Sequence, residues 1–365
     1  MTNKKTTLLD IAESLGISIG TVHRALHDHP EVNAATRAKV LQAAKALGYH
    51  PNLAARYLSQ KRRIRISVNT LKGTTSFWDE VRNGILDESS SAGLRNVELE
   101  FRTYPQLGDD ATAFQQALAA NVDGIIAFPS RPSLVTPWIN RAREAKIPVV
   151  CVVTDAPASN RIAVVSIDTM ASGSLAGDLM GRLLRGKGTV SATVSSLAIT
   201  EHAEKFQGFC KAIEDFYPEV AVEPAIEDND IESEAYEKCR ALFRRKPDLA
   251  GIYVTTEASI PVLSAARNAG MIGKLSIITT DLFSELIPEL RSGVVTATIQ
   301  QRPMTQGRTA FRLLHQHLVE GECPPQVTLA PHLVTRGNLD FFLQRDSFEP
   351  SSGETPFKVE ATNVG

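Results

Sequence analysis

Two groups of side chains in this sequence have types that could bind a ligand, and the chain separates them widely. The first group lies near the N-terminal end and consists of Ser18, Ile19, Gly20, Thr21, His23, Arg24 and His27. Arg24 could bind the edge of a guanine through two hydrogen bonds or hold a phosphate, while Ile19 and Gly20 allow apolar contact with bases or close approach to them. These side chains on the outer face of one helix predict contacts in the major groove of DNA.

The second group lies at the ends of segments that are predicted to be strands. Its members are Phe77, Trp78, Asp155, Thr256, Asp281 and Gln301, together with His202 and Lys205 on a predicted helix. Carboxylates and amides exchange hydrogen bonds with neighbouring hydroxyl groups, and aromatic rings cover the apolar side of a sugar, so the group predicts a site for a small sugar or polyol. In the alternative interpretation the aromatic residues are core anchors, the aspartates cap turns or helices, and His202 lies on the surface.

Three short helices should position the first group. Thr7 can cap the first helix, with Asp10 three residues later in a capping-box pattern, and Gly16 stands where the chain must turn before Ser18 caps the second helix. A third helix is expected over about residues 33–47, ended by Gly48. The predicted core consists of Ile11, Ala12, Leu15, Val22, Leu26, Val40, Ala44 and Leu47. This arrangement is typical of a helix-turn-helix.

Short buried strands alternate with amphipathic helices from residue 64 onwards, and these should position the second group. The expected strands are 65–68, 122–127, 147–153, 162–165, 189–196, 251–254, 276–280 and 294–299, and the clearest helices are 77–92 and 109–120. The alternation predicts parallel sheets with helices on both faces, in two halves that divide near residues 165–174. Ligands in such folds bind at the carboxyl ends of the strands.

Charge is unevenly distributed along the 365 residues, whose net charge is −2. Up to Arg63 there are ten basic and four acidic residues, a balance of +6, whereas the remainder carries 29 basic and 37 acidic residues, a balance of −8. A basic head on an acidic body indicates a contact with a polyanion at one end of the molecule.

The cysteines and the hydropathy pattern suggest where the protein works. Cys151, Cys210, Cys239 and Cys323 are far apart, which suits a reducing cytosol and argues against a disulfide framework or a zinc site. No apolar run approaches membrane-spanning length, and the polar start of the chain is not typical of a secretory signal. We therefore expect a cytoplasmic protein without a membrane contact, metal or other cofactor.

The head resembles the lac repressor family. The likeness rests on Asp10-Ile-Ala, Gly16-Ile-Ser, Thr21-Val, Arg24, the Thr36-Arg-x-Lys-Val segment and Leu47-Gly-Tyr-x-Pro-Asn-x-x-Ala-Arg-x-Leu58. At His23 the family more often has serine. The resemblance implies that residues 52–59 form a short hinge helix on operator DNA, where Leu58 wedges between base steps. In the alternative interpretation, the segment is a basic linker and Leu58 is buried against the next domain. The expected DNA contacts are Thr7, Ser18, Ile19, Gly20, Thr21, His23, Arg24, His27, Asn52, Ala55, Arg56 and Leu58.

The body, from about residue 64 to residue 338, resembles the periplasmic sugar-binding proteins of the ribose type. The matching segments are Val122-Asp-Gly-Ile-Ile, Ile147-Pro-Val-Val, Thr279-Thr-Asp281 and the stretch from Gly293 to Gly307. The resemblance implies ligand contacts at Phe77, Trp78, Asp155, Asp281 and Gln301. It is weaker at Thr256 and over residues 197–204, where those proteins usually have Asn and Arg.

We therefore predict an α/β protein of four parts. A three-helix DNA-binding domain (1–50) is followed by a hinge helix or linker (51–63). The effector domain (64–342) is two-lobed and periplasmic-binding-protein-like, with parallel sheets covered by helices, and a disordered tail (343–365) follows it. It would regulate transcription, by family habit as a repressor, on a pseudo-palindromic operator as a homodimer that responds to a sugar or polyol. One alternative is a sugar-binding protein without a DNA role, against which the basic head argues. The other is an enzyme acting on sugars; no phosphate-binding loop, nucleophile elbow or metal spacing supports it.

Overall fold

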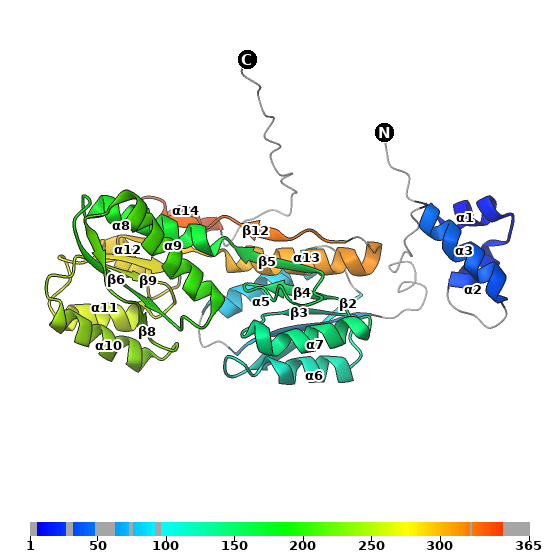
Figure 1. The fold of residues 1–365 in the computed structure, drawn as a ribbon, viewed down its shortest axis with the longest axis horizontal. Coiled ribbons are helices and arrows are strands. Elements are labelled where there is room, and N and C mark those ends of the chain that lie inside the picture. Colours follow the sequence, from blue (N-terminus) through cyan, green and yellow to red (C-terminus); the bar gives the residue numbers. More distant parts are fainter. Residues whose placement is uncertain are drawn as a thin grey trace, which may run out of the picture.

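The computed structural model describes residues 6–26, 32–47, 63–72, 76–91, 96–321 and 323–345. Within these ranges the chain forms a small helical head and a body of two α/β lobes (Figure 1). The expected DNA contacts His27, Asn52, Ala55, Arg56 and Leu58 lie outside the described residues, as do nearly all of the predicted hinge and tail.

The head contains α1 (Leu8–Leu15), α2 (Ile19–Leu26) and α3 (Ala34–Ala46). The predicted capping box of α1 is confirmed: the Thr7 hydroxyl accepts a hydrogen bond from the Asp10 backbone N–H, and the Asp10 carboxylate accepts one from the Thr7 N–H. Gly16 ends α1 with a φ of 64°, a conformation that most L residues avoid. The Ser18 hydroxyl accepts a 3.1 Å hydrogen bond from the Thr21 N–H and so caps α2, as predicted.

The head has a hydrophobic core of its own, centred on Ile11, Val22 and Val40, which are fully buried. The prediction that Leu47 faces this core is wrong, since 41% of Leu47 is exposed. The physical reason is that Leu47 is the C-cap of α3, with φ −87° and ψ 0°, so its side chain leaves the buried face that Val40 and Ala44 share.

Lobe 1 is built on a six-stranded sheet with the strand order β12-β5-β4-β3-β1-β2, and the pairs along it are parallel. Its strands are β1 (Ile64–Leu71), β2 (Val97–Tyr104), β3 (Gly124–Ala127), β4 (Val149–Val152), β5 (Ala163–Ile167) and β12 (Val327–Leu329). Its helices are α5 (Ser76–Ser91), α6 (Asp110–Ala119), α7 (Pro132–Glu144) and α13 (Pro303–Glu320).

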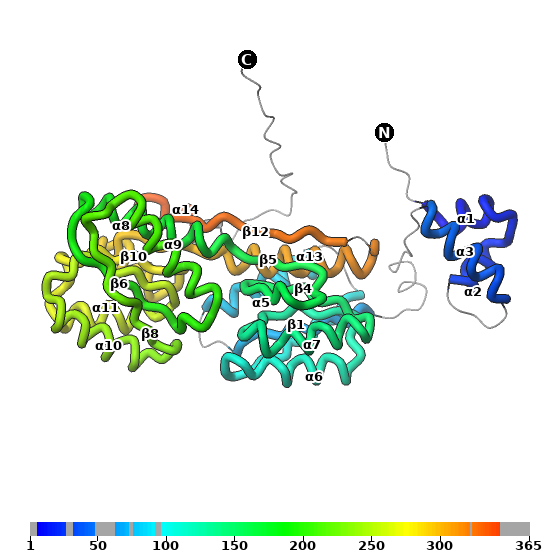
Figure 2. Tube along the Cα trace, in the orientation of Figure 1, coloured from blue at the N-terminus to red at the C-terminus, as the bar shows by residue number. Residues whose placement is uncertain are grey.

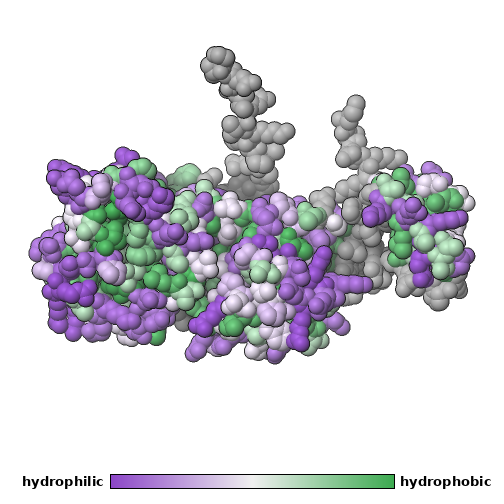
Figure 3. Space-filling model, in the orientation of Figure 1, coloured by the Kyte–Doolittle hydropathy of each residue, from purple (hydrophilic) through white to green (hydrophobic). Residues whose placement is uncertain are grey.

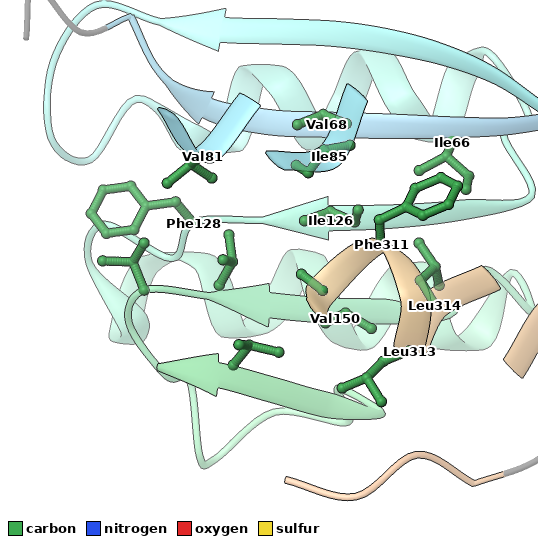
Figure 4. Close-up of a cluster of buried hydrophobic side chains, with 14 of the residues drawn as sticks. Ile66, Val68, Val81, Ile85, Ile126, Phe128, Val150, Phe311, Leu313 and Leu314 are labelled. Atoms are coloured by element: carbon green, nitrogen blue, oxygen red, sulfur yellow. The ribbon is translucent and has the colours of Figure 1, made fainter. Parts of the chain in front are cut away.

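The two faces of the lobe 1 sheet carry different helices. On one face, α13 lies beside α5 although it comes much later in the chain (Figure 2). In the core between this helix pair and the sheet, Ile126 and Val150 lie near Phe311 and Leu314 of α13 (Figure 4). A second core, which includes Phe114 of α6, packs α6 and α7 against the sheet. Lobe 1 therefore needs a late segment of the chain to complete its core.

Lobe 2 is built on a seven-stranded sheet with the order β13-β11-β10-β9-β6-β7, and β8 also pairs with β6. Its strands are β6 (Gly188–Val194), β7 (Val220–Val222), β8 (Ile226–Glu227), β9 (Gly251–Val254), β10 (Ser276–Thr280), β11 (Ala297–Gln300) and β13 (His332–Val334). The pair β11–β13 is antiparallel and the other pairs are parallel. Its helices are α8 (Thr169–Leu183), α9 (Thr200–Phe216), α10 (Glu232–Arg245), α11 (Ser259–Asn268), α12 (Ile287–Ser292) and α14 (Leu339–Arg345).

Helix α14 runs to Arg345, three residues past the predicted end of the body at residue 342, because Phe342 and Leu343 pack against the core of lobe 2. Hydrophilic and hydrophobic residues are interspersed on the face of the molecule in Figure 3. No helix in the described ranges is both long and apolar enough to cross a membrane.

The chain crosses between the lobes three times, after β5, after β11 and after β12. The first crossing lies within the predicted division near residues 165–174. The Asp168 N–H donates a 3.0 Å hydrogen bond to the Leu329 carbonyl, which joins the first crossing to the third. At the second crossing, Gln306 of α13 donates its side-chain amide to the Gln301 carbonyl at 2.8 Å. The first bond therefore ties two crossings together, and the second ties the remaining crossing to α13 of lobe 1.

Two helix pairs pack so closely that a glycine is required at the contact. A Cβ atom on Gly307 of α13 would lie 2.1 Å from the Val81 carbonyl oxygen of α5, and one on Gly173 of α8 would lie 1.9 Å from the Lys205 carbonyl oxygen of α9. Both neighbours are backbone atoms, which can only give way if a whole helix moves. The glycines therefore set the distance between the helices.

We expect Gly307→Ala to lower the free energy of unfolding of lobe 1 by about 1–3 kcal/mol, because α13 must move away from α5. Both tryptophans, Trp78 and Trp138, lie in lobe 1, so urea unfolding followed by tryptophan fluorescence measures this change. Gly20→Ala is the matched control: it lies in α2, where the nearest atom to a new Cβ is the Ser18 hydroxyl oxygen at 3.8 Å. An unfolding curve of Gly307→Ala identical to that of the control would contradict the close packing.

Candidate functional site

The outer face of α2 is exposed and carries the side chains expected to read DNA. Ile19, Gly20, His23 and Arg24 are exposed, with 46% of Ile19 accessible to solvent. Thr21 is half-buried, and its hydroxyl is hydrogen-bonded to the Ser18 hydroxyl at 2.8 Å. The buried residues of α2 lie on its opposite face. A helix that shows solvent an isoleucine, a glycine and an arginine in its first two turns has the surface that a major groove can accept.

The predicted residues of the body follow the carboxyl ends of strands in both sheets. Phe77 and Trp78 begin α5 after β1, Asp155 follows β4, Thr256 follows β9, Asp281 follows β10, Gln301 follows β11, and His202 and Lys205 lie on α9 after β6. The structure brings Lys205, Asp281 and Gln301 into one hydrogen-bonded network, and the other five have partners elsewhere.

Asp281 is the acceptor at the centre of this network. It is 4% exposed and has a φ of 62°, which aspartate tolerates better than most residues. One carboxylate oxygen accepts a 2.8 Å hydrogen bond from the Gln301 N–H, and the other accepts a 2.5 Å bond from the Gln301 side-chain amide. Burial raises the pKa of Asp281 to about 7, and the Glu257 carboxylate adds to this shift, while the hydrogen bonds from Gln301 oppose it.

Lys205 is a buried cation beside this acceptor, with only 1% of its surface exposed. Its ammonium group donates to Glu201 Oε1 at 2.6 Å, to Gln301 Oε1 at 2.7 Å and to the Thr255 carbonyl at 3.5 Å. Burial acts against the charged form of Lys205, but the Glu201 carboxylate keeps its pKa above the ordinary value. Burial also acts against the charge on Glu201, and the charges of Lys205 and His202 nevertheless hold the pKa of Glu201 below its ordinary value. The two groups therefore stay ionised together.

Glu201 is a residue of the network that the sequence did not single out. It lies one helical turn before Lys205 on α9, a spacing that favours an ion pair. That spacing was the available signal, but it does not by itself distinguish a buried pair from an exposed one.

Two hydrogen-bonded contacts join the lobes at these strand ends. Glu257 of lobe 2 accepts hydrogen bonds from the Ser76 hydroxyl and the Phe77 N–H, both at 3.1 Å, at the first turn of α5 in lobe 1. Thr154, after β4 of lobe 1, donates its hydroxyl to Glu201 at 3.4 Å. A carboxylate at a helix N-terminus is stabilised by the unpaired N–H groups there. The carboxyl edges of the two sheets therefore face each other.

The two predicted aromatic residues pack into lobe 1 behind this edge. The Phe77 and Trp78 rings meet edge to face with centroids 5.2 Å apart, and the Trp78 ring lies 4.5 Å from that of Phe128. All three belong to the hydrophobic core of lobe 1 and are almost fully buried. Their burial fits the alternative in which they anchor the core.

The remaining predicted residues have partners of their own. Both carboxylate oxygens of Asp155 accept hydrogen bonds from the Arg161 guanidinium, so Asp155 stands apart from the network around Asp281. The Thr256 hydroxyl accepts a 3.2 Å bond from the Ala258 N–H. His202 is half-buried with Nδ1 3.4 Å from the Thr255 hydroxyl, and burial lowers its pKa.

The arrangement combines carboxylate acceptors and an amide at two facing sheet edges, which suits a ligand with several hydroxyl groups. In the part of the chain that the structure describes, no group of three or more His, Cys, Asp or Glu side chains could hold a metal ion.

Comparison with known proteins extends to both parts of the molecule. Residues 66–322 match the family of periplasmic binding protein domains, and residues 7–52 match the lacI family of bacterial regulatory proteins. The chain is 25% identical to catabolite control protein A of Priestia megaterium over 337 residues, which are 90% of this chain and 97% of that protein. It is 26% identical to the ribose operon repressor of Halalkalibacterium halodurans over 317 residues, 85% of this chain and 89% of that protein.

Among solved structures, GanP, a glucose-galactose binding protein from Geobacillus stearothermophilus, covers 76% of this chain with 99% of its own, at a TM-score of 0.71 and 24% identity. At that identity the likeness concerns the fold alone, and it is the fold of the body. The chain belongs to the periplasmic binding protein domain family and, with its lacI-type head, is a DNA-binding regulator of the LacI family.

Proposed function

We propose that this protein represses transcription from a pseudo-palindromic operator and that a small sugar or polyol, bound between the two lobes, controls its affinity for the operator. The observation that carries the proposal is the presence in one chain of an exposed α2 face suited to a DNA groove and of a buried hydroxyl-binding network between facing sheet edges. The relatives support it, since one is a ribose operon repressor similar over 85% of this chain.

The parts of the proposed regulator follow the predicted domains. Residues 1–50 would bind the operator, residues 51–63 would form the hinge, and the body from residue 64 would bind the effector. The full set of predicted DNA contacts remains part of the proposal: Thr7, Ser18, Ile19, Gly20, Thr21, His23, Arg24, His27, Asn52, Ala55, Arg56 and Leu58. One three-helix head buries little surface, so two copies would bind together as a homodimer. Because the operator lies in the bacterial cytoplasm, the protein would work there.

The proposed switch is a change in the relation between the lobes. The bonds from Glu257 to α5 and from Thr154 to Glu201 already join the two edges. An effector between the edges would add to these bonds or replace them, and it would shift the equilibrium by its difference in affinity for the two arrangements. The predicted effector contacts are Phe77, Trp78, Asp155, His202, Lys205, Thr256, Asp281 and Gln301.

A thermal-shift screen of the full chain tests the effector class. We expect at least one of D-ribose, D-glucose, D-galactose and D-arabinose to raise Tm, because a ligand present at 100 times its Kd stabilises the folded state by about 2.7 kcal/mol. The matched controls are D-ribose 5-phosphate and D-glucose 6-phosphate. A rise in Tm with the phosphorylated sugars only would contradict the proposed effector class, since the network around Asp281 offers acceptors for hydroxyl groups.

Arg24→Ala tests the DNA-binding face. We expect a loss of operator affinity of about 10- to 100-fold, because one bidentate contact with a base is worth about 1–3 kcal/mol. The operator would first be selected from random DNA, and binding would be measured by fluorescence anisotropy at one fixed salt concentration. Lys45→Ala is the control, because Lys45 is also an exposed cation of the head but lies in the last turn of α3. Equal losses in the two variants would show that Arg24 contributes only charge.

The pH dependence of sugar binding tests the role of Asp281. An ionised carboxylate accepts hydrogen bonds from hydroxyl groups more strongly than the neutral acid does. Since the pKa of Asp281 is about 7, we expect affinity for the sugar found in the screen to rise between pH 6 and pH 8 as the carboxyl group loses its proton. Titration calorimetry would measure this rise. Burial also raises the pKa of Asp228 to about 7, so Asp228→Asn is the control and should leave the rise unchanged.

A further inference from the structure

We propose that Lys205 is a positioning residue of the effector site. Together with Glu201, it fixes the side-chain amide of Gln301 so that the amide NH₂ group faces Asp281. The Asp281 carboxylate then accepts hydrogen bonds from two neighbouring hydroxyl groups of the effector. This inference rests on the proposed function, from which it takes a hydroxylated effector. It gives Lys205 a role different from the direct ligand contact that the sequence predicts.

The hydrogen bonds of Lys205 leave it nothing to offer a ligand. An ammonium group has three N–H donors, and the three contacts of Lys205 are Glu201 at 2.6 Å, Gln301 at 2.7 Å and the Thr255 carbonyl at 3.5 Å. The side chain is also enclosed, with 1% of its surface exposed. Lys205 can therefore act on an effector only through the groups that it binds.

The orientation of the Gln301 amide follows from the chemistry of its two neighbours. An ammonium group cannot accept a hydrogen bond, so the Gln301 side-chain oxygen must face Lys205. The amide nitrogen then points the other way and donates to Asp281 at 2.5 Å. Turning the amide over would bring its NH₂ group against the ammonium group. Lys205 thus keeps the Gln301 amide in one orientation even when Asp281 is protonated.

The fixed amide leaves the Asp281 carboxylate with spare acceptor capacity. The described hydrogen bonds bring one donor to each oxygen, from the Gln301 N–H and from its side chain. A carboxylate has about four lone-pair positions, so each oxygen can accept one more bond. Two such positions on one carboxylate suit hydroxyl groups on adjacent carbon atoms.

The charges around Asp281 come from two directions. From α9, the Lys205 charge acts on it; from β9 and the loop that follows, Tyr253 and Glu257 do so. Burial and the Glu257 charge raise the pKa of Asp281, while the Gln301 hydrogen bonds and the Lys205 charge lower it. Removing the Lys205 charge should therefore raise this pKa further and make the carboxylate a poorer acceptor near neutral pH.

The network also reaches lobe 1 at both ends. Glu201 accepts a hydrogen bond from Thr154 of lobe 1, and the Gln301 carbonyl accepts one from Gln306 of α13. The position of the Asp281 acceptor is thus connected through Lys205 to the arrangement of the two lobes.

The first test replaces the buried pair by neutral residues of similar size, Lys205→Met with Glu201→Gln. Both residues are changed because a buried carboxylate without its partner would destabilise the protein. The matched control is Lys211→Met with Asp215→Asn, a pair on the same helix with the same spacing and a 2.8 Å separation that is exposed. The full chain, labelled with ¹³C in its aspartate carboxyl groups, is titrated by NMR without added sugar, and the Asp281 signal is identified by its loss in Asp281→Asn.

We expect the midpoint of the Asp281 titration to rise in the neutral pair, because the Lys205 charge that lowers it is gone, and to stay unchanged in the control. An unchanged midpoint in the neutral pair would overturn the inference. Should the neutral pair fail to fold, Lys205→Gln with Glu201→Gln replaces it, because two amide groups can hydrogen-bond to each other and neither leaves a buried charge unpaired. The same rise is expected, and its absence has the same meaning.

The second measurement is affinity for D-ribose, D-glucose and D-galactose, by calorimetry at pH 7. We expect the neutral pair to bind the preferred sugar at least tenfold more weakly than the wild type, while the control with Lys211→Met and Asp215→Asn binds it as tightly as the wild type. Equal sugar affinities would overturn the positioning role. If the wild type binds none of these sugars, the proposed sugar effector fails, whereas the titration still decides whether Lys205 controls Asp281.

Discussion

The structure of the body requires that two sheets of mainly parallel strands face each other at the edges where their strands end. In a parallel sheet the loops that follow the strands share one edge, so polar residues distant in the sequence come together there. Three crossings join the two lobes; a hydrogen bond at Asp168 ties the first crossing to the third, and one from Gln306 ties the second crossing to α13. Because both lobes supply residues at these edges, a group bound between them would contact both lobes.

The second constraint on the site is that a buried ion pair must have hydrogen-bond partners. A lysine and a glutamate that are both removed from water are stable only if every donor and acceptor finds a partner. In this protein that requirement draws Gln301 to Lys205 and Thr154 to Glu201, and through Gln301 it extends to Asp281. The ion pair fixes the positions of the side chains around it more than it stabilises the fold, since buried ion pairs often add little net free energy of folding.

Central elements could be predicted from the sequence because their signals are local and strong. The segments 251–254 and 276–280 coincide with β9 and β10, which are almost wholly buried and therefore appear as short apolar runs between polar turns. The capping box at Thr7 was equally readable, because it needs only residues three positions apart. The edge strands β2 and β12 were not predicted, because their signals in the sequence are weak or depend on distant segments. β2 alternates half-buried and exposed residues, and β12 has three residues whose partner strand lies far back in the chain.

The site was only partly predictable, because the spacing of residues in the sequence does not show which of them are buried. Glu201 with Lys205 and Lys211 with Asp215 are both pairs of opposite charge four residues apart on α9, yet the first is buried and the second exposed. The difference arises from which face of α9 meets α8 and the crossing at Gln301, and these contacts depend on the whole fold. Leu47 shows the same limit in the head, where a periodic pattern was extended one residue past the point at which the helix ends.

The placement of α13 has a consequence for how the chain acquires its structure as it is made. The head is complete within its first 47 residues and can fold as soon as it leaves the ribosome. The lobe 1 strands emerge next, but Phe311 and Leu314, which cover one face of their sheet, are synthesised only after most of lobe 2. During that interval α5 is the only helix of the pair on this sheet face, and the apolar part that α13 will cover is the kind of surface that binds chaperones or aggregates. The stage of synthesis between β5 and α13 is thus the most vulnerable period in the life of this protein.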